Sequence, residues 1–311
     1  RKNGYFNTTF TFGANRTRID KLNGREDVIW MTPSKGWKSS EADYMLKVGD
    51  QLGLIYGYVY DGIYRFDEFD LQGLNYVAKP GTVNNDALFG TQPGRPKFKN
   101  FVDDEGAENV VNEKDKVVIG NTNPKFSGGL NLFGGWGNFD MSANFFFMYG
   151  FDVNNATRYT LSSFENNTNN YYNVLPEFNE KARWRYAEDV YGDRLISDAR
   201  YVQLYQEMNA NATIFSPVDI GKKVTHSYFI EDGSFLRLQD VTVGYTLPKH
   251  TLGRVKLNTV RVFLSGYNLF LWTKYTGYDP EVDVQTGLTP GIDYNRYPRS
   301  RNFLAGINIT F

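Results

Sequence analysis

Large apolar residues alternate with small or polar ones along several stretches of this chain. The last stretch, 303–311, shows this most clearly, because its even positions after Leu304 are Gly306, Asn308 and Thr310. A period of two places successive side chains on opposite faces of a β-strand. The pattern therefore predicts a strand whose apolar face consists of Phe303, Ala305, Ile307, Ile309 and Phe311.

The same period recurs upstream and predicts seven strands. Two of them, 126–132 and 139–149, flank the glycine-rich segment 134–138 and so form a hairpin. In the strand 235–247 the apolar positions change parity, and one β-bulge near Gln239 and Asp240 restores a single apolar face. The other predicted strands are 5–15, 44–60, 260–272 and 303–311.

The connections between these strands suggest an all-β, antiparallel transmembrane barrel. If the C-terminus is periplasmic, the segments 61–123, 151–233 and 273–299 form long extracellular loops. The turns 134–138 and 248–256 and the connector 17–42 then lie inside. Short inner turns with long outer loops are typical of outer-membrane barrels. This frame also groups aromatic residues at an outer rim (Tyr149, Phe151, Phe270, Trp272, Tyr275) and an inner rim (Trp136, Tyr245, Phe311).

Seven strands cannot close a barrel, which needs at least about eight, so we expect this chain to be part of a larger one. The chain opens on Arg1 without a methionine, which we interpret as a cut or processed start. Pairing of a closing strand with the first strand of a barrel would also explain an aromatic residue at position 311.

Composition removes several other classes of protein. The 34 basic and 35 acidic residues leave a net charge of −1, which offers no attraction to nucleic acid. Cysteine is absent, so disulfides, thiolate metal sites and cysteine nucleophiles are excluded. No run approaches the roughly 18 apolar residues of a membrane helix. A β-barrel escapes that test, because its strands alternate lipid-facing and lumen-facing residues.

The segment 231–248 reads EDGSFLRLQDVTVGYTLP. It resembles a signature of the SusC/RagA-like TonB-dependent outer-membrane transporters. Further matching segments are SGYNLF at 265–270, TKYTGYDPE at 273–281, GIDY at 291–294, IYGY at 55–58 and DGIY at 61–64. The resemblance covers nearly the whole chain, and 231–311 carries its most specific part.

This resemblance implies a fold and a function. Such transporters are 22-stranded barrels of the Gram-negative outer membrane that enclose an N-terminal plug and import oligosaccharides or peptides. A SusD-like surface lipoprotein caps them, and the TonB-ExbB-ExbD system drives uptake. The resemblance places residues 1–311 in the C-terminal portion of the barrel, with the plug and the N-terminal part outside this chain.

Candidate chemistry is sparse. His226 and His250 are far apart and lack the neighbours of a catalytic or zinc motif, so we expect neither to be catalytic and predict no enzyme and no metal centre. The acidic patch 103–106 lies where family members carry a calcium-type loop. Phe101 and Asn112 stand at its first and twelfth ligand positions, so the oxygen set is incomplete. We interpret the patch as a solvated acidic loop, with calcium as the alternative.

Substrate contacts are expected from the outer loops and the lumen, where rings stack on sugars and polar groups bind hydroxyl or peptide groups. The candidates lie in the longest loop: Tyr171, Tyr172, Trp184, Arg185 and Tyr186. The alternative is that these side chains pack within the loop or against the lipoprotein. In the closing strand, we interpret Phe303, Ile307 and Ile309 as lipid-facing and Phe311 as the terminal aromatic that barrel assembly reads.

Two other functions stay open at the level of sequence. A soluble β-rich binding or adhesion domain would show the same alternation, and it would stay soluble and monomeric without detergent. A glycan hydrolase would need an apposed pair of carboxylates, and no pair is singled out by the sequence.

Overall fold

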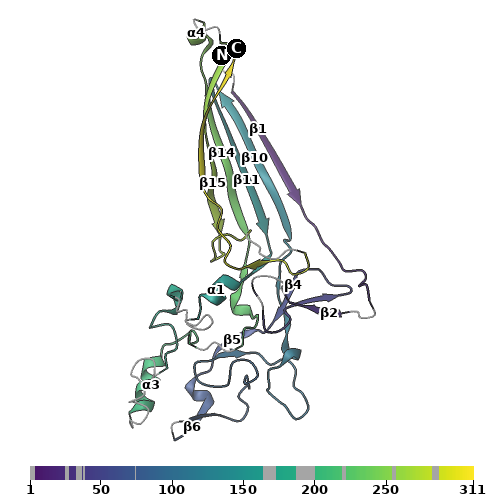
Figure 1. Cartoon of the computed structure of the whole chain (residues 1–311), viewed down its shortest axis with the longest axis vertical. Helices are drawn as coiled ribbons and strands as arrows, with labels where there is room; N and C mark the ends of the chain where they lie inside the picture. Colours follow the sequence, from purple (N-terminus) through teal and green to yellow (C-terminus); the bar gives the residue numbers. More distant parts are fainter. Residues whose placement is uncertain are drawn as a thin grey trace.

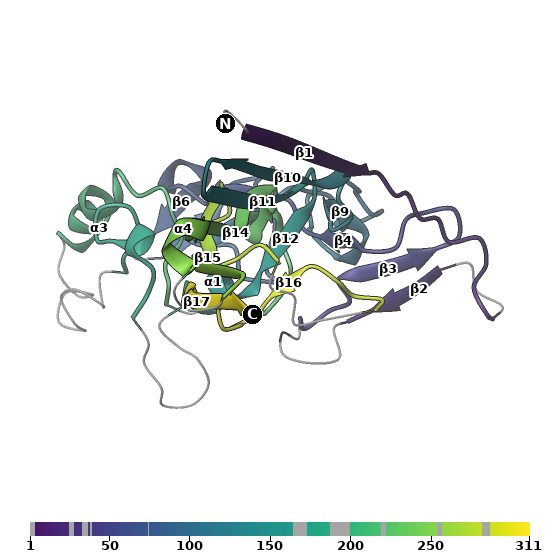
Figure 2. The ribbon, with the colours of Figure 1, turned by 90° about the horizontal axis from the view of Figure 1, so that it is seen from above.

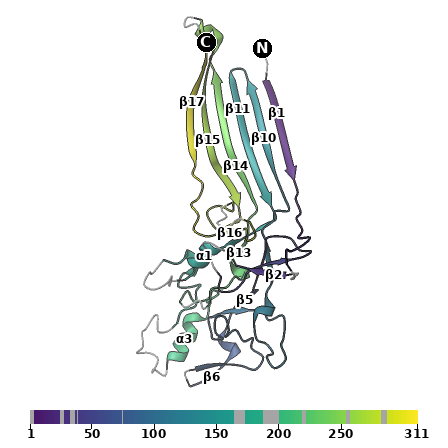
Figure 3. The same ribbon diagram turned by 45° about the vertical axis from the view of Figure 1, so that its right-hand side comes forward.

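The six longest strands form one open antiparallel sheet. The structure is a computed structural model that describes residues 4–24, 28–32, 37, 39–73, 75–163, 173–186, 200–218, 222–253, 257–281 and 287–311. The strand order is β1-β10-β11-β14-β15-β17, as Figure 3 shows. The strands are β1 Gly4–Gly13, β10 Phe126–Trp136, β11 Phe139–Tyr149, β14 Phe235–Thr246, β15 Thr259–Thr273 and β17 Asn302–Thr310.

The sheet has two unlike ends (Figure 1). At the turn end, both ends of the chain lie near helix α4 (Lys249–Leu252) and the turn between β10 and β11. That turn contains Gly137 with φ +61°, a conformation that glycine adopts without strain. At the loop end, the chain makes three long excursions, which are the segments 14–125, 150–234 and 274–301. We call their described residues the loop-end unit.

Two predictions about the first excursion are wrong. The stretch 44–60 is not one long strand of the sheet, because β3 (Tyr44–Lys47) and β4 (Leu54–Gly57) pair as a hairpin in the loop-end unit. Gly49 and Gly53, with φ +98° and +83°, let the chain turn between them. The connector 17–42 lies at the loop end, since β1 runs away from the turn end. Six of the seven predicted strands therefore form the sheet.

One face of the sheet is apolar from edge to edge. The register places Ile307, Val262, Tyr245, Phe139 and Trp136 in one row across five strands. The next row runs through Ala305, Leu264, Val243, Met141, Gly134 and Phe6. Most large members of these rows are exposed, including Phe6, Trp136, Leu264 and Ile307. This face is the one that the sequence pattern predicts, including the odd positions of β17.

The opposite face is mainly polar. Thr9, Asn131, Asn144 and Asp240 form one of its rows. The bulge predicted near Gln239 is confirmed, because the pairing of β14 with both of its neighbours shifts between Leu238 and Asp240. The extra residue moves Leu236 and Leu238 back onto the apolar face, opposite Trp272 and Phe270.

The loop-end unit contains several small sheets. The first is β2-β3-β4-β9, with β2 Val28–Met31 and β9 Val117–Asn121. A second sheet, β13-β12-β16, joins Ile230–Asp232, Asp152–Asn155 and Ile292–Asp293, and β12 and β16 run parallel. Two strand pairs complete it, β5 (Tyr60–Ile63) with β8 (Pro96–Phe98) and β6 (Phe69–Gln72) with β7 (Asn75–Ala78). Seen from above in Figure 2, β2 and β3 extend to one side of the long strands.

Helices are short in the described part of the chain. They are α1 (Ala156–Thr160) and α3 (Tyr201–Asn209), together with α4 and the single turns Phe66–Glu68, Glu113–Asp115, Pro176–Phe178 and Ser227–Phe229. None of the helices that the structure describes is long and apolar enough to cross a membrane.

An apolar junction fixes the loop-end unit to the polar face of the sheet. Phe235 of β14 packs with Phe151, Val153 and Tyr275, and Phe146, Met148 and Leu271 of the sheet border this cluster. Arg237 of β14 adds a buried ion pair to Asp279, with 2.6 Å between Nη2 and Oδ1. Of the aromatic residues predicted at the outer rim, Phe151 and Tyr275 are therefore buried in the junction, whereas Tyr149, Phe270 and Trp272 are exposed.

Candidate functional site

All three excursions contribute to one aromatic core in the loop-end unit. Trp37, Tyr44 and Ile55 come from the first, Tyr159, Trp184 and Phe215 from the second, and Ile292 from the third. All seven are fully or nearly fully buried. The excursions therefore pack together as one unit, whose surface lies next to the polar face of the sheet.

The structure describes three of the five predicted substrate contacts. Trp184 has an exposed fraction of 0%, and its Nε1 donates to the Tyr205 hydroxyl at 2.9 Å. The backbone N–H of Arg185 donates to Asn209, and Tyr186 is half-buried against the core. This arrangement matches the alternative of packing within the loop. Tyr171 and Tyr172 lie outside the described residues.

A pocket of about 270 Å³ opens beside α1. Residues of the second excursion form one wall and residues of the third form the other. Tyr278, with an exposed fraction of 69%, is the aromatic residue among those that line it. The lining residues are Asn155, Thr157, Arg158, Leu161, Leu175, Pro176, Glu177, Thr276, Gly277, Tyr278 and Asp293.

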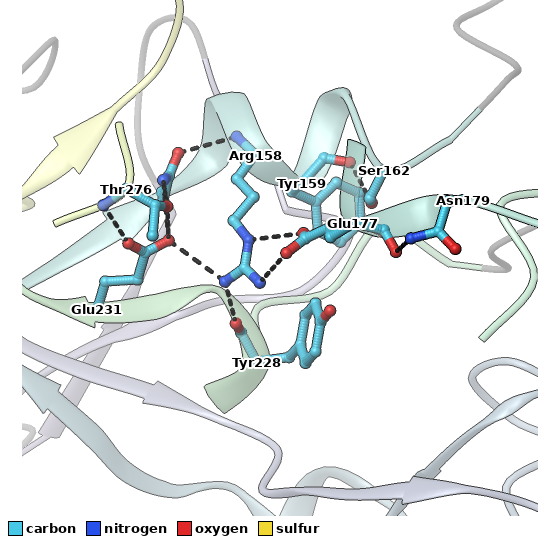
Figure 4. Close-up of polar contacts among 9 residues, drawn as sticks. Arg158, Tyr159, Ser162, Glu177, Asn179, Tyr228, Glu231 and Thr276 are labelled. Atoms are coloured by element: carbon cyan, nitrogen blue, oxygen red, sulfur yellow. Dashed lines mark hydrogen bonds and ion pairs between the residues drawn. The ribbon is translucent and has the colours of Figure 1, made fainter. Parts of the chain in front are cut away.

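Arg158 is the most heavily bonded group of the pocket (Figure 4). Its Nε and Nη2 donate to the two carboxylate oxygens of Glu177, each at 3.0 Å. Its Nη1 donates to the Tyr228 carbonyl at 3.1 Å and to Glu231 at 3.3 Å. The Asn155 side chain caps α1 by accepting from the Arg158 backbone N–H, which fixes the start of the side chain.

Glu231 joins the two walls of the pocket. Its carboxylate accepts from the backbone N–H and the hydroxyl of Thr276, both at 2.8 Å, and from the Asn155 amide at 2.9 Å. Because Thr276 belongs to the third excursion and Asn155 to the second, this carboxylate fixes their spacing. Both carboxylates that bond Arg158 are thus bound to protein donors.

Asp293 is the third carboxylate at this pocket. Its exposed fraction is 2%, and burial raises the pKa of its carboxyl. Tyr275 donates to Oδ2 at 2.7 Å. The Thr157 hydroxyl lies 3.5 Å from Oδ1 and 3.3 Å from the Asp293 carbonyl oxygen. Sequence reasoning missed this residue, although it lies in the GIDY segment that carried the resemblance.

The polar face of the sheet has a second hollow over small residues, which include Gly13, Ser127, Gly128 and Gly129. A line of side-chain hydrogen bonds borders it, in which Asn131 donates to Asn144, and Asn144 donates to Asp240 at 2.8 Å. Nearer the turn end, Arg261 of β15 donates twice to Asp140 of β11, across the intervening strand β14. These groups make the polar face suitable for contact with a polar polypeptide segment or a polar solute.

The acidic patch 103–106 belongs to a loop that is held by protein groups. Lys114 pairs with Asp104 at 2.5 Å, and Asp103 accepts from the backbone N–H of Asn109. The buried Asp115 accepts from three backbone N–H groups. Among the described residues, no group of three or more His, Cys, Asp or Glu side chains is placed to hold a metal ion.

His226 is buried at an exposed fraction of 1% among aromatic rings, with Phe229 and Phe98 at centroid distances of 4.8 and 5.1 Å. Burial, together with the nearby Arg158, lowers the pKa of its imidazole to about 3. The other histidine of the chain, His250, is exposed in α4. The structure does not bring the two histidines together.

The chain is similar in sequence to known TonB-dependent receptors. No protein-family model matches the chain. The TonB-dependent receptor P3 of Formosa agariphila is 28% identical over 98% of this chain and 27% of its own length. The TonB-dependent receptor SusC of Bacteroides thetaiotaomicron is 38% identical over 85 residues, which are 27% of this chain and 8% of SusC.

Among solved structures, the RagAB peptide importer in its open-open state matches all of this chain and 27% of the importer chain, at 21% identity and a TM-score of 0.62. That likeness shows the fold, and the antiparallel β fold expected from the sequence is confirmed. The similarity to SusC/RagA-like TonB-dependent receptors is confirmed as well. The chain spans about a quarter of the length of the receptor P3 and of the importer chain.

Proposed function

We propose that this chain, similar over its length to TonB-dependent receptors, is a portion of the barrel of an outer-membrane importer. One observation carries the proposal. The six-stranded sheet has one continuous apolar face that is exposed and one polar face that carries the loop-end unit. In the proposed barrel, lipid covers the apolar face and the solute passes along the polar face. Strands of membrane barrels alternate apolar and polar side chains in this way.

The imported solute is an oligosaccharide or an oligopeptide, and the work of the protein is binding and gated passage without bond making. A SusD-like lipoprotein covers the loop-end unit, and the TonB-ExbB-ExbD system acts through parts of the receptor outside residues 1–311. In this arrangement Phe303, Ile307 and Ile309 face lipid at the outer-membrane barrel surface. Of the substrate candidates from the sequence, Arg185 and Tyr186 retain exposed atoms for contact.

Uptake by living cells tests this proposal. A host that expresses the full-length receptor should accumulate a labelled oligomer, and deletion of TonB should reduce accumulation to the level of a receptor-deleted strain. Uptake that persists without TonB would remove energy coupling from the proposal. Extraction gives an independent test, because a full-length protein that stays soluble and monomeric without detergent would contradict the membrane assignment.

A further inference from the structure

The loop 99–116, between β8 and β9, has the residue spacing of a calcium-binding loop. In such a loop, oxygen ligands stand at the first, third, fifth, seventh, ninth and twelfth positions, and the chain turns sharply at the sixth. With Asp104 as the first position, Asn109 is the sixth and has φ +60°, a left-handed conformation that asparagine tolerates. Val110 at the seventh position offers a carbonyl, and Asp115 is the twelfth. The conformation of Asn109 favours this register over the one that begins at Phe101.

The oxygen atoms of this loop do not suit a calcium ion. The third position is Gly106, which has no side-chain oxygen. Asp115, at the twelfth position, is fully buried, and its two carboxylate oxygens accept from the backbone N–H groups of Phe101, Val102 and Asn112. A carboxylate that already accepts three hydrogen bonds has little capacity left to bind an ion through both oxygens. The third and twelfth positions are therefore both unsuited to the ion.

A lysine ammonium lies where the remaining ligand positions meet. Nζ of Lys114 is 2.5 Å from Oδ1 of Asp104, the first position. Asn112, the ninth position, donates through Nδ2 to Oδ2 of Asp104 at 3.1 Å and to the carbonyl of Val110, the seventh position, at 3.4 Å. The hydrogen bond from Lys114 also lowers the pKa of the Asp104 carboxyl. Lys114 thus supplies a positive charge to an ionised carboxylate at the first position of the loop.

We propose that the ammonium of Lys114 replaces the calcium ion in this loop, so that the loop keeps its shape without a divalent cation. In a calcium loop the bound ion offsets the repulsion between ligand oxygens that lie close together. Here Lys114 neutralises Asp104, and the amide of Asn112 joins Asp104 to the carbonyl of Val110. In the proposed barrel this loop is extracellular, so its surface does not depend on the calcium content of the medium.

Hydrogen exchange in the purified full-length receptor tests this proposal. The peptide 98–116 contains the backbone N–H groups that donate to Asp103 and Asp115. In the wild type these groups should exchange at the same rate in EDTA and in excess CaCl2. In Lys114→Met they should exchange about two- to fivefold faster in both solutions, which is the range expected for loss of an exposed ion pair. Because the measurement is confined to this peptide, ions bound elsewhere in the receptor do not affect it.

Two matched variants separate the charge of Lys114 from other effects. Lys114→Arg keeps a cation at this position and should retain the slow exchange of the wild type. Lys181→Met removes an exposed lysine from the second excursion and should leave exchange in the peptide 98–116 unchanged. Slower exchange of the wild type in CaCl2, or exchange of Lys114→Met at the wild-type rate, would overturn the proposal. Recovery of Lys114→Met in CaCl2 would also overturn it, because the loop would then bind calcium through its own oxygens.

A double variant tests whether Lys114 acts through Asp104. Asp104→Asn should speed exchange by a factor similar to that of Lys114→Met, because each change removes the same ion pair. The combination of the two changes should then have no larger effect than either change alone. Additive effects would show that the two residues act separately, which would contradict the proposal. Failure of the import function is distinguishable, since it would appear in uptake and would leave these exchange rates unchanged.

Discussion

The sheet and the loop-end unit use aromatic residues in opposite ways. Trp136, at the turn end of the sheet, has an exposed fraction of 78%, whereas Trp184 in the loop-end unit is fully buried. Phe6, Phe10 and Phe303 are similarly exposed on the apolar face. The rings of the sheet are exposed on its apolar face, whereas the rings of the loop-end unit are buried by other side chains of the same chain. Aromatic residues thus have different surroundings in the two regions.

This difference has an energetic consequence. The loop-end unit is stabilised by burial of its own side chains, as in a water-soluble domain. The sheet combines interstrand hydrogen bonds with an apolar face whose stabilisation comes from lipid in the proposed barrel. Substitutions in the two regions should therefore respond to different surroundings.

The largest expected effect comes from the buried tryptophan. Trp184→Ala should destabilise the loop-end unit by about 3–5 kcal/mol, because it leaves a cavity in the core. The lost contacts are those with Phe66, at a ring distance of 4.8 Å, and with Tyr205. Thermal unfolding and limited proteolysis of the full-length receptor measure the loss. The matched variant Trp136→Ala should change stability by less than about 1 kcal/mol, and equal effects would erase the contrast.

A charge on the apolar face should have the next largest effect. Leu264 is exposed at 57% near the middle of β15, and Leu264→Arg should destabilise the barrel by about 2–4 kcal/mol in lipid vesicles. The control Thr9→Arg places the same charge on the polar face. Folding in vesicles, followed by the heat-dependent shift in gel mobility, compares the two. A larger penalty for Thr9→Arg would reverse the assignment of the faces.

The smallest of the three effects is a dependence on pH that only the loop-end unit should show. The folded state holds His226 neutral with a pKa of about 3, whereas the unfolded chain takes up a proton below about pH 6.5. Protonation thus favours unfolding, and His226 should lower the free energy of unfolding by about 2 kcal/mol between pH 7 and pH 5. Asp43 opposes part of this fall, because burial raises the pKa of its carboxyl to about 6 and the folded state takes up that proton. Denaturant titration at the two pH values measures this change.

The variant His226→Phe tests the origin of that change. A phenyl ring fits the surrounding cluster of Phe98 and Phe229, and it carries no titratable proton. The variant should lose the fall that His226 causes, whereas His250→Phe, at the exposed helix α4, should keep it. An unchanged dependence in His226→Phe would assign the effect to other groups.

The hydrophobic pattern succeeded for the sheet because each long strand has one apolar and one polar face. A period of two then specifies strand, face and bulge together, as it did for β14 and β17. It failed at 44–60, where Tyr44, Leu46, Leu52 and Leu54 keep one parity across a turn. Parity alone does not distinguish one long strand from two short strands that are buried in the same core.

The site residues illustrate a second limit. Trp184 was a reasonable substrate contact by residue type, but type does not reveal that Phe66 and Tyr205 cover it. For His226 the sequence predicted only that it is not catalytic, and its burial among rings gives it a stability role. In both cases the missing information was the identity of neighbours that are distant in the chain.

The sequence by itself determined the long antiparallel strands, the apolar face and the bulge at Gln239, because these depend on residues that are adjacent or paired through short turns. Only the tertiary structure decided the loop-end unit and its pocket. Arg158, Glu177, Glu231 and Asp293 meet there across separations of 19 to more than 100 residues. No local sequence period reveals that these four residues lie together, because their proximity depends on how the three excursions pack into one core.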